Sequence, residues 1–140
     1  MTLTPAERDY LAGQPLGRLA TRRPDGSLQN NPVGFSYNEL TGTIDISGRA
    51  LGATHKFQNV AANGAVALVI DDLVSMSPWT VRGVEIRGHA EALVGQTPRS
   101  SYSSSEIIRI YPRRVISWGI GPEPGMHGRD VDSVTTDGTA

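Results

Sequence analysis

Residues 17–35 read "GRLATRRPDGSLQNNPVGF", and this stretch predicts two antiparallel strands joined by a tight turn. The turn signal is "PDG" at 24–26, because proline, aspartate and glycine each favour turn geometry for a separate reason. Residues 16–22 lead into the turn and residues 27–37 resume the extended pattern after it. The stretch therefore predicts a β-hairpin at the start of a mainly β fold.

Four further segments are predicted to be strands: 43–47, 65–70, 80–94 and 113–120. The first, "TIDIS", alternates apolar and polar residues with a period of two, and the second, "AVALVI", is a continuous apolar run. The third is long and contains glycines, at which we expect a bend or a bulge. We expect a turn at Asp71 and Asp72. The sequence thus predicts about six antiparallel strands.

Helix signals occur at three places. Thr4, Pro5 and Glu7 form a capping pattern that predicts a short helix ending near Gly13. Residues 54–62 have the apolar spacing of a second short helix, and residues 103–111 resemble a third, stopped by a proline at 112.

The length and the composition place this pattern in a single small domain. The chain has 140 residues, of which 38% are hydrophobic, enough for one domain with a substantial core. We assign residues 1–120 to a small antiparallel barrel with appended helices, because a closed barrel removes exposed sheet edges. Residues 121–140 are rich in glycine, proline and polar residues, and we expect an irregular or flexible tail there.

Charge and composition also exclude several function classes. The net charge of −1 gives no basic surface for general capture of nucleic acid. There is no cysteine, so the chain has no disulfide, thiolate metal site or cysteine nucleophile. No apolar run is long enough to cross a bilayer and the N-terminus does not read as a signal peptide, so we expect a cytoplasmic protein.

Lys56 is the only lysine among the 13 lysines and arginines of the chain. It lies in the first turn of the helix expected at 54–62, where backbone N–H groups and the helix dipole favour an anion. Thr54 and His55 can add donors, which together describe a phosphate site. From spacing alone, a solvated helix face explains the same residues, so both interpretations stay open.

Three other features are candidates for a ligand site. Pro32 interrupts a predicted strand, which indicates either an edge where a flat ligand lies or a plain edge strand. Trp79 and Trp118 are candidates either for the wall of a ring-binding cleft or for ordinary core positions. The three histidines are widely spaced and lack a metal-binding pattern, so we expect no metal site.

Several motifs in fixed order resemble a known superfamily. They are "GRLATRRPDGSLQNNPVGF", "TIDIS", "THKFQNVAANGAVALVIDD", "RGVEIRGHAEAL" and "YPRRVISWG". Together they resemble the split β-barrel superfamily typified by pyridoxamine 5′-phosphate oxidase, an FMN-binding fold. The similarity is greatest to the branch that uses the deazaflavin coenzyme F-420.

This resemblance implies a set of cofactor-binding residues. Lys56 takes the position of the basic residue that grips the cofactor phosphate, with Thr54 and His55 beside it, and Asn59 shares its polar helix face. Ser47 and Arg49 approach the same group from the preceding strand and loop, and the backbone of Asn31, Pro32 and Val33 lies against the ring system. His55 stands where flavin-using relatives often have a second strong cation, and Gly64 replaces a proline of their pattern.

The resemblance also implies a homodimer with cofactor sites at the subunit interface. Trp79, Arg82 and Trp118 are then candidates to reach a site from either subunit. No residue is assigned as catalytic, and the proton that balances hydride transfer is expected from solvent or from Arg82.

Three functions follow as hypotheses. The first is an oxidoreductase that transfers a hydride from reduced F-420 to an unsaturated organic acceptor. The second is an FMN-binding enzyme of the pyridoxamine-phosphate-oxidase type. The third is a module without enzyme activity that binds a cofactor, haem or another tetrapyrrole.

Overall fold

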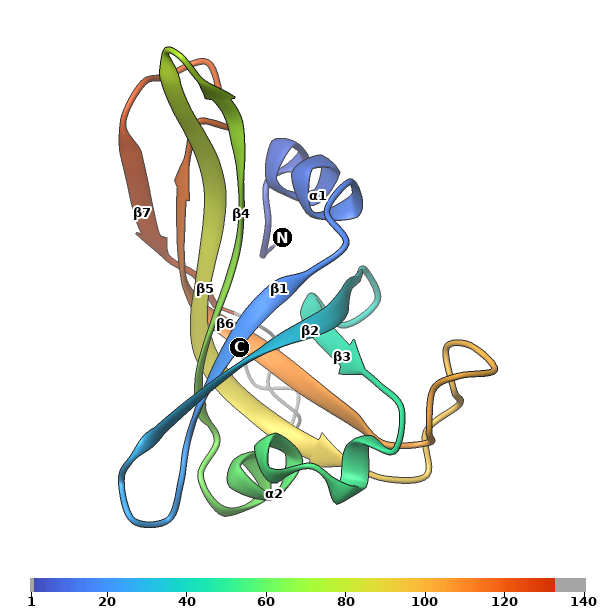
Figure 1. Cartoon of the computed structure of the whole chain (residues 1–140). Coiled ribbons are helices and arrows are strands. Elements are labelled where there is room, and N and C mark those ends of the chain that lie inside the picture. Colours follow the sequence, from blue (N-terminus) through green and yellow to red (C-terminus); the bar gives the residue numbers. More distant parts are fainter. Residues whose placement is uncertain (1, 133–140) are drawn as a thin grey trace.

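A computed structural model describes residues 2–132 of the chain as one antiparallel sheet with two short helices (Figure 1). The elements in chain order are α1 (Pro5–Ala12), β1 (Gly17–Arg22), β2 (Leu28–Asn38), β3 (Thr43–Ser47), the single 3-10 turn η1 (Leu51–Ala53), α2 (His55–Ala62), β4 (Ala65–Met76), β5 (Trp79–Leu93), β6 (Ile107–Trp118) and β7 (Met126–Asp130). The predicted class, a mainly β split barrel with short helices, is confirmed.

Six of the strands close into a ring. The sheet order is β3-β2-β1-β4-β5-β6-β7, and β3 also pairs with β6. Residues 108–110 of β6 bond to β3, whereas residues 114–118 of the same strand bond to β7. One edge of β6 is therefore divided between two partners, and β7 is added outside the ring of six.

The barrel interior is filled by aliphatic side chains from every strand of the ring. Leu19, Leu68, Ile86, Ile46 and Ile110 are each at most 1% exposed. In β1, β3 and β4 they alternate with exposed or half-buried residues, which gives these strands one apolar inner face. Helix α2 packs against β1 and β5 at one end of this core.

The predicted N-terminal cap is confirmed. The Thr4 hydroxyl accepts from the Glu7 N–H at 3.1 Å, and the Glu7 carboxylate accepts from the Thr4 N–H at 2.9 Å. The Glu7 carboxylate also receives two hydrogen bonds from Arg129 of β7, at 2.6 and 2.8 Å. Helix α1 is thereby attached to the last strand of the sheet.

The helix predicted at 103–111 is wrong, because Ile107–Trp118 forms the single strand β6. The apolar residues of this segment follow a helix-like spacing because both faces of the strand are covered in the fold. Pro112 does not stop the strand, since it lies opposite Gly88 at a register shift where Arg113 has no partner on β5. A bulge tolerates a residue that has no N–H to donate.

Two other expectations are corrected. Asp71 and Asp72 do not form a turn but continue β4 to Met76, paired with Gly83 and Arg82 of β5. The segment after Gly119 is not wholly irregular, because Met126–Asp130 forms β7 against β6. The part of the expected tail at 133–140 lies outside the described residues.

Within residues 2–132, neither helix has the length and apolar character needed to cross a bilayer. The cytoplasmic location stays a prediction.

Candidate functional site

The loop between β3 and α2 is held in one conformation by contacts from the segment that precedes β6. Ser104 donates its N–H to the Gly48 carbonyl at 3.0 Å, and its Oγ accepts from the Leu51 N–H at 3.0 Å. The Glu106 carboxylate accepts from the Gly52 N–H at 3.0 Å. Hydrogen bonds from Ser104 and from the Gly52 backbone lower the pKa of Glu106 below its ordinary value.

Ala50, inside this loop, has a left-handed backbone with φ of 50° and ψ of 42°. This region is disfavoured for a residue with a Cβ, by about 1 kcal/mol or more. Strained backbone of this kind is concentrated at ligand-binding sites. Along the chain, Ala50 lies between Ser47 and Lys56, two residues that the sequence analysis assigned to the cofactor site.

Lys56 lies in the first turn of α2, as predicted, and is half-buried. Among the described residues no carboxylate and no hydrogen-bond acceptor contacts its ammonium group. The backbone N–H groups of His55 and Lys56 likewise have no acceptor there. We call this half-buried cation, together with the two N–H groups, the Lys56 seat. An anion at this point would pair with the ammonium group and accept from the two N–H groups.

Thr54 begins the helix and does not offer its hydroxyl to the seat. Its Oγ1 accepts from the Phe57 N–H at 3.3 Å and donates to the Leu51 carbonyl at 2.6 Å. The hydroxyl is thus committed to the N-cap. His55 and Arg49 are exposed.

Strand β2 supplies the second group of predicted residues. Gly34 of β2 pairs with Ser47 at the end of β3, which fixes β2 against the start of the loop. Asn31 and Val33 lie on the inner face of β2, whereas Pro32 lies on the exposed outer face opposite Arg18. Residues 28–33 of β2 pair with β1 alone among the described strands, because β3 pairs with residues 34–38, so Pro32 lies where one edge of β2 is open, as predicted.

Asn59 is 5% exposed and joins α2 to the first hairpin. Its side-chain amide donates to Thr21 Oγ1 at 3.1 Å and to Gln29 Oε1 at 2.9 Å. Both amide hydrogens are used inside the protein, so Asn59 holds α2 against the hairpin and has no amide hydrogen left for a cofactor.

A cavity of about 520 Å³ lies between the β1–β2 turn and the outer side of α2. His55, Gln58 and Asn59 line it from the helix, and Arg23, Pro24 and Asp25 line it from the turn. Two of the predicted site residues, His55 and Asn59, therefore border this cavity, whereas Lys56 is not among its lining residues.

The remaining candidates lie at the other end of the molecule. Toward one end of β5, Arg82 pairs with Asp72 of β4 and Gly83 pairs with Trp118 of β6. His89, which pairs with Ala65 of β4, lies toward the other end of β5, near α2. Seven residues separate Arg82 from His89 along β5, which at about 3.3 Å per residue is roughly 20 Å. One copy of the chain therefore does not bring Arg82 or Trp118 to the Lys56 seat.

The guanidinium of Arg82 is also already paired within the protein. Its guanidinium makes two hydrogen bonds to the Asp72 carboxylate, at 2.8 and 3.1 Å, and lies 5.1 Å from the centre of the Tyr10 ring. The bonds to Asp72 raise the pKa of Arg82 above its ordinary value. A guanidinium held this way is a poor proton donor, which favours solvent over Arg82 as the source of the balancing proton.

Comparison with known proteins agrees with this architecture. The family model described as pyridoxamine 5′-phosphate oxidase matches residues 3–136. The chain belongs to this family. A curated relative, the 5a,11a-dehydrotetracycline/5a,11a-dehydrooxytetracycline reductase of Streptomyces rimosus, is 45% identical over 134 residues, which is 94% of each chain. This similarity to a named reductase over nearly the whole length supports an oxidoreductase.

Solved structures show the same fold at low identity. A conserved hypothetical protein from Mycobacterium tuberculosis superposes with a TM-score of 0.65 at 22% identity, covering 83% of this chain and 84% of that one. A heme binding protein from Mycobacterium smegmatis superposes with a TM-score of 0.64 at 16% identity, covering 93% of this chain and 60% of that one. At these levels of identity, both comparisons show the fold alone.

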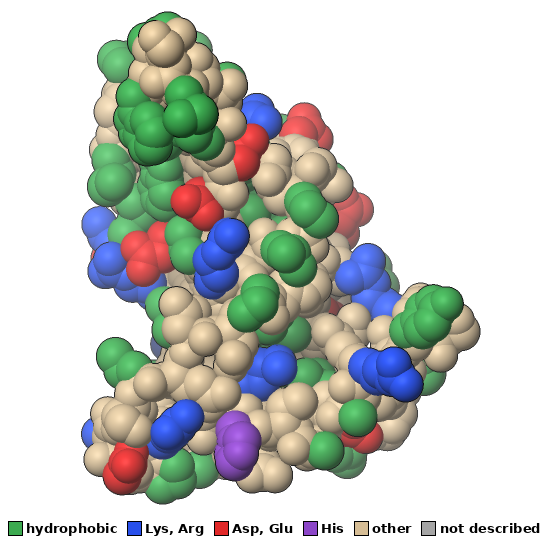
Figure 2. Space-filling model, in the orientation of Figure 1, with side chains coloured by type: hydrophobic (Ala, Val, Ile, Leu, Met, Phe, Trp, Pro, Cys, Tyr) green, Lys and Arg blue, Asp and Glu red, His purple; other side chains and the backbone are tan. Residues whose placement is uncertain are grey.

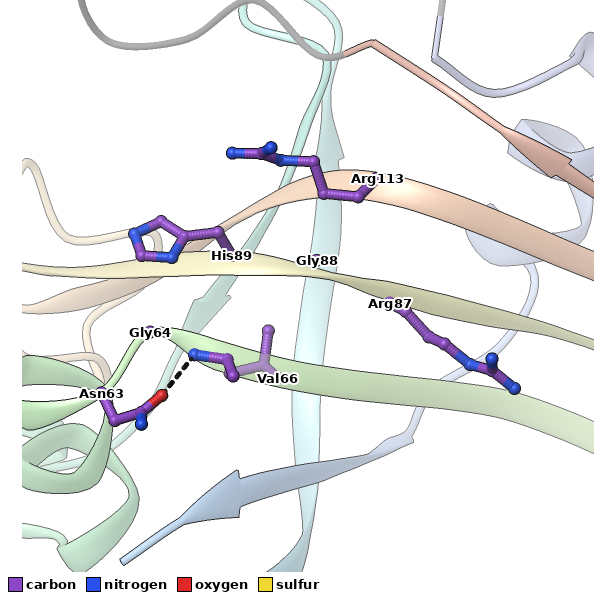
Figure 3. A pocket seen from close by; sticks show the side chains of 8 residues that line it. Asn63, Gly64, Val66, Arg87, Gly88, His89 and Arg113 are labelled. Atoms are coloured by element: carbon purple, nitrogen blue, oxygen red, sulfur yellow. Dashed lines mark hydrogen bonds between the residues drawn. The ribbon is translucent and has the colours of Figure 1, made fainter. Parts of the chain in front are cut away.

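One departure from the pattern of flavin-using relatives has a local explanation in this member of the pyridoxamine 5′-phosphate oxidase family. Gly64, which stands where those relatives have a proline, follows Asn63, the C-cap of α2, beside an open cavity of about 560 Å³ (Figure 3). A Cβ at Gly64 would lie within 2.6 Å of His89 Nδ1 and 2.7 Å of the Ala90 carbonyl oxygen. The close passage of β5 therefore requires a glycine.

Sequence reasoning missed the polar residues that hold α2 against the hairpin, Thr21 and Gln29. In this family member they face each other across β1 and β2, on the inner face of the barrel. A signal was present, because both are polar at inward positions of a predicted hairpin. Polar residues at such positions require a hydrogen-bond partner from another element.

Proposed function

We propose that this protein is a reductase that uses F-420 and transfers a hydride to a conjugated carbon–carbon double bond of an electron-poor ring compound. The observation that carries the proposal is the Lys56 seat, a half-buried cation that suits a cofactor phosphate, in a chain without a redox-active cysteine. The Streptomyces rimosus relative supports the acceptor class, since its named substrates are 5a,11a-dehydro compounds.

The residues of the chain bind and orient rather than react. Lys56 and the first N–H groups of α2 would hold the phosphate, and the Asn31–Val33 segment of β2 would lie along the remainder of the cofactor. When bound, a reduced deazaflavin supplies a hydride, which is the chemistry that the protein itself lacks. Holding the acceptor in reach of that hydride needs no protein nucleophile. Since Arg82 is committed to Asp72, the balancing proton would come from solvent.

A direct test mixes the protein without oxygen with reduced F-420 and a panel of enones, quinones and dehydrotetracycline-type substrates. We expect loss of reduced cofactor absorbance only with acceptors that have a conjugated double bond. Deuterium at the transferring position of the cofactor should appear in the product. Turnover that requires reduced FMN would support the oxidase-type alternative, and tight F-420 binding without turnover would support a binding module.

We further propose that the working site is shared between two copies of the chain. The Lys56 seat and the segment with Arg82 and Trp118 lie at opposite ends of the β4–β5 hairpin, so only a second copy would bring them together. The tip of this hairpin carries exposed apolar side chains, among them Met76 at 76% and Trp79 at 68% exposure. Figure 2 shows hydrophobic side chains gathered at this upper end of the molecule.

Mixing two weakened variants, at a cofactor concentration that saturates the wild type but neither variant, tests the shared site. Lys56→Ala and Trp79→Ala would each lack one half of every site, but a mixed dimer would contain one intact site. We expect activity to return on mixing, and sedimentation at micromolar concentration to give a species of twice 15.0 kDa. Mixtures that stay inactive, or a 15.0 kDa monomer that binds cofactor with wild-type affinity, would contradict a shared site.

A further inference from the structure

Two cavities adjoin over strand β2. One has a volume of about 610 Å³ and the other has a volume of about 590 Å³. Ser36, Tyr37, Glu39 and Arg99 line both of them, so we treat the two as one space and call it the β2 groove. Sites for small organic molecules have volumes of about 300–1,000 Å³. Each half of the groove is therefore large enough for a ring compound.

The walls of the β2 groove come from α1 and from the segment that joins β5 to β6 (Figure 1). Leu11 of α1 and Pro15 contribute apolar surface, and Gln96 contributes an amide from the β5–β6 segment. Helix α1 is held in place by its ion pair with β7 and by the Tyr10 hydroxyl, which donates to the Asp72 carboxylate at 2.7 Å. The groove thus has apolar and polar walls and is formed before a ligand arrives.

An ion pair forms part of the floor of the groove. Arg109 of β6 donates from Nε and Nη2 to the two carboxylate oxygens of Asp45 of β3, at 3.1 and 3.0 Å. The same carboxylate accepts from Thr43 at 2.8 Å and from Asn38 at 3.0 Å, so each of its oxygens receives two hydrogen bonds. The side chains of Arg109 and Asp45 are only 19% and 14% exposed. The charge of Asp45 is thereby offset within the protein.

Arg109 keeps donors for a ligand. A guanidinium has five N–H groups, and the bonds to Asp45 use two of those on Arg109. These bonds fix the plane of the guanidinium and raise the pKa of Arg109 above its ordinary value, so the group stays charged. Because Arg109 lines the groove, its further N–H groups can meet a ligand oxygen there.

The outer face of β2 connects the groove with the segment proposed to hold the cofactor. Pro32 is exposed on this face, and Gly34 is the next residue on it. A Cβ at Gly34 would meet no atom within 4 Å apart from its chain neighbours, so the space over this residue is open. Ser36 follows on the same face and lines both cavities. The groove therefore begins three residues beyond Val33, about 10 Å along the strand.

We infer that the β2 groove binds the acceptor of the reductase and that Arg109 is a catalytic residue, which donates to the carbonyl oxygen of a conjugated ketone. This inference rests on the proposed function, which supplies the hydride. When a hydride adds to the carbon β to the carbonyl, the electron pair of the carbon–carbon double bond shifts toward the carbonyl and an enolate forms. N–H donors aimed at the enolate oxygen stabilise its negative charge. A proton from solvent then adds to the α-carbon, so the double bond gains two hydrogens while reduced F-420 is oxidised.

The other polar groups of the groove indicate an acceptor with several oxygens. The guanidinium of Arg99 and the hydroxyls of Ser36 and Tyr37 add donors that both cavities share. Compounds of the tetracycline class carry several carbonyl and hydroxyl oxygens on fused rings, and the substrates named for the Streptomyces rimosus relative belong to this class. The groove therefore fits an oxygen-rich ring ketone.

Arg109→Gln tests the catalytic role, with Arg87→Gln as its matched control. Arg87 makes the same kind of two-bond pair, with Glu85 at 3.0 and 3.1 Å, but lines neither cavity of the groove. With reduced F-420 and a dehydrotetracycline-type acceptor, we expect Arg109→Gln to lower kcat by about a hundredfold or more. Arg87→Gln should change kcat by less than about threefold.

Binding of tetracycline to the cofactor-free protein, followed by tetracycline fluorescence, gives a measurement that needs no turnover. Arg109→Gln should weaken this binding by about tenfold. Ser36→Leu, which fills the groove from the outer face of β2, should weaken it at least as much. Both variants should keep the F-420 affinity of the wild type, whereas Lys56→Ala should keep its tetracycline affinity. Thermal midpoints identify a variant that fails to fold, and if Arg109→Gln does so, Ser36→Leu decides.

Three results would overturn the assignment of the groove. The first is an equal loss of kcat in Arg109→Gln and Arg87→Gln, and the second is a tetracycline affinity that neither Arg109→Gln nor Ser36→Leu lowers. The third is a wild type that reduces the acceptor but does not bind tetracycline. A wild type that binds tetracycline through Arg109 but neither binds nor oxidises F-420 would overturn the proposed function and leave the groove supported as the site for this class of ligand.

Discussion

Lys56→Ala should bind F-420 about ten- to a hundredfold more weakly than the wild type, with almost no change in thermal stability. The loss corresponds to removing one charge-assisted hydrogen bond from a partly buried anion, about 1.5–3 kcal/mol. The fold should survive, because no described residue depends on the Lys56 ammonium for a hydrogen bond or an ion pair. Titrating both proteins with oxidised F-420 and following cofactor fluorescence measures the difference.

Two controls make this result specific for the phosphate. Arg22→Ala removes a cation from an exposed position of β1 and should change affinity by less than about threefold, since exposed charges are strongly screened. A deazaflavin without the phosphate should bind equally to wild type and Lys56→Ala. Equal dissociation constants of the two proteins for intact F-420 would show that the Lys56 seat does not bind the cofactor phosphate.

Arg129→Leu should lower the free energy of unfolding at pH 7 by roughly 3 kcal/mol, near the lower limit for breaking a buried ion pair. The Glu7 side chain is only 3% exposed and would lose its cation, whereas Arg129 itself is 37% exposed. For a domain of this size the midpoint of thermal unfolding should fall by about 10 °C. Arg114→Leu is the matched control, because its partner Asp130 is 86% exposed and the pair contributes about 1 kcal/mol at most.

The same pair predicts a dependence on pH. Burial raises the pKa of Glu7, but hydrogen bonds from Arg129 and Thr4 more than offset it, so the pKa lies below 4.5 in the folded protein. The pair therefore stabilises the fold fully above about pH 4.5, and this contribution is lost as pH falls through the lower folded pKa. The stability difference between wild type and Arg129→Leu should narrow in acid. A constant difference from pH 7 to pH 3, or equal losses in Arg129→Leu and Arg114→Leu, would contradict the assignment.

Local signals in the sequence were sufficient wherever one short segment determined its own structure. The turn at Pro24 to Gly26 fixes the first hairpin, and Thr4 with Glu7 fixes the first cap, because both depend on residues a few positions apart. Lys56 could be placed in the first turn of α2 for the same reason.

Long-range packing determined the features that the sequence left out or misassigned. Residues 107–111 have a spacing that fits a helix, and only the burial of both faces in the sheet makes them a strand. Asp71 and Asp72 read as a turn because two adjacent carboxylates are unfavourable in an isolated strand, yet Arg18 and Arg82 pair with them across the sheet. The link from Asn59 to Gln29 joins residues 30 positions apart, so no local pattern reports it.

The left-handed residue Ala50 has a consequence for the thermodynamics of binding. A glycine would relieve the strain there, but it would also let the β3–α2 loop sample many more conformations before a ligand arrives. Alanine, together with the tethers from Ser104 and Glu106, holds the loop in a single shape in the empty protein. Preorganisation of this kind moves the entropy cost of ordering the loop from the binding step to the folding step. The protein is slightly less stable as a result, and it binds its anion with little loss of conformational entropy.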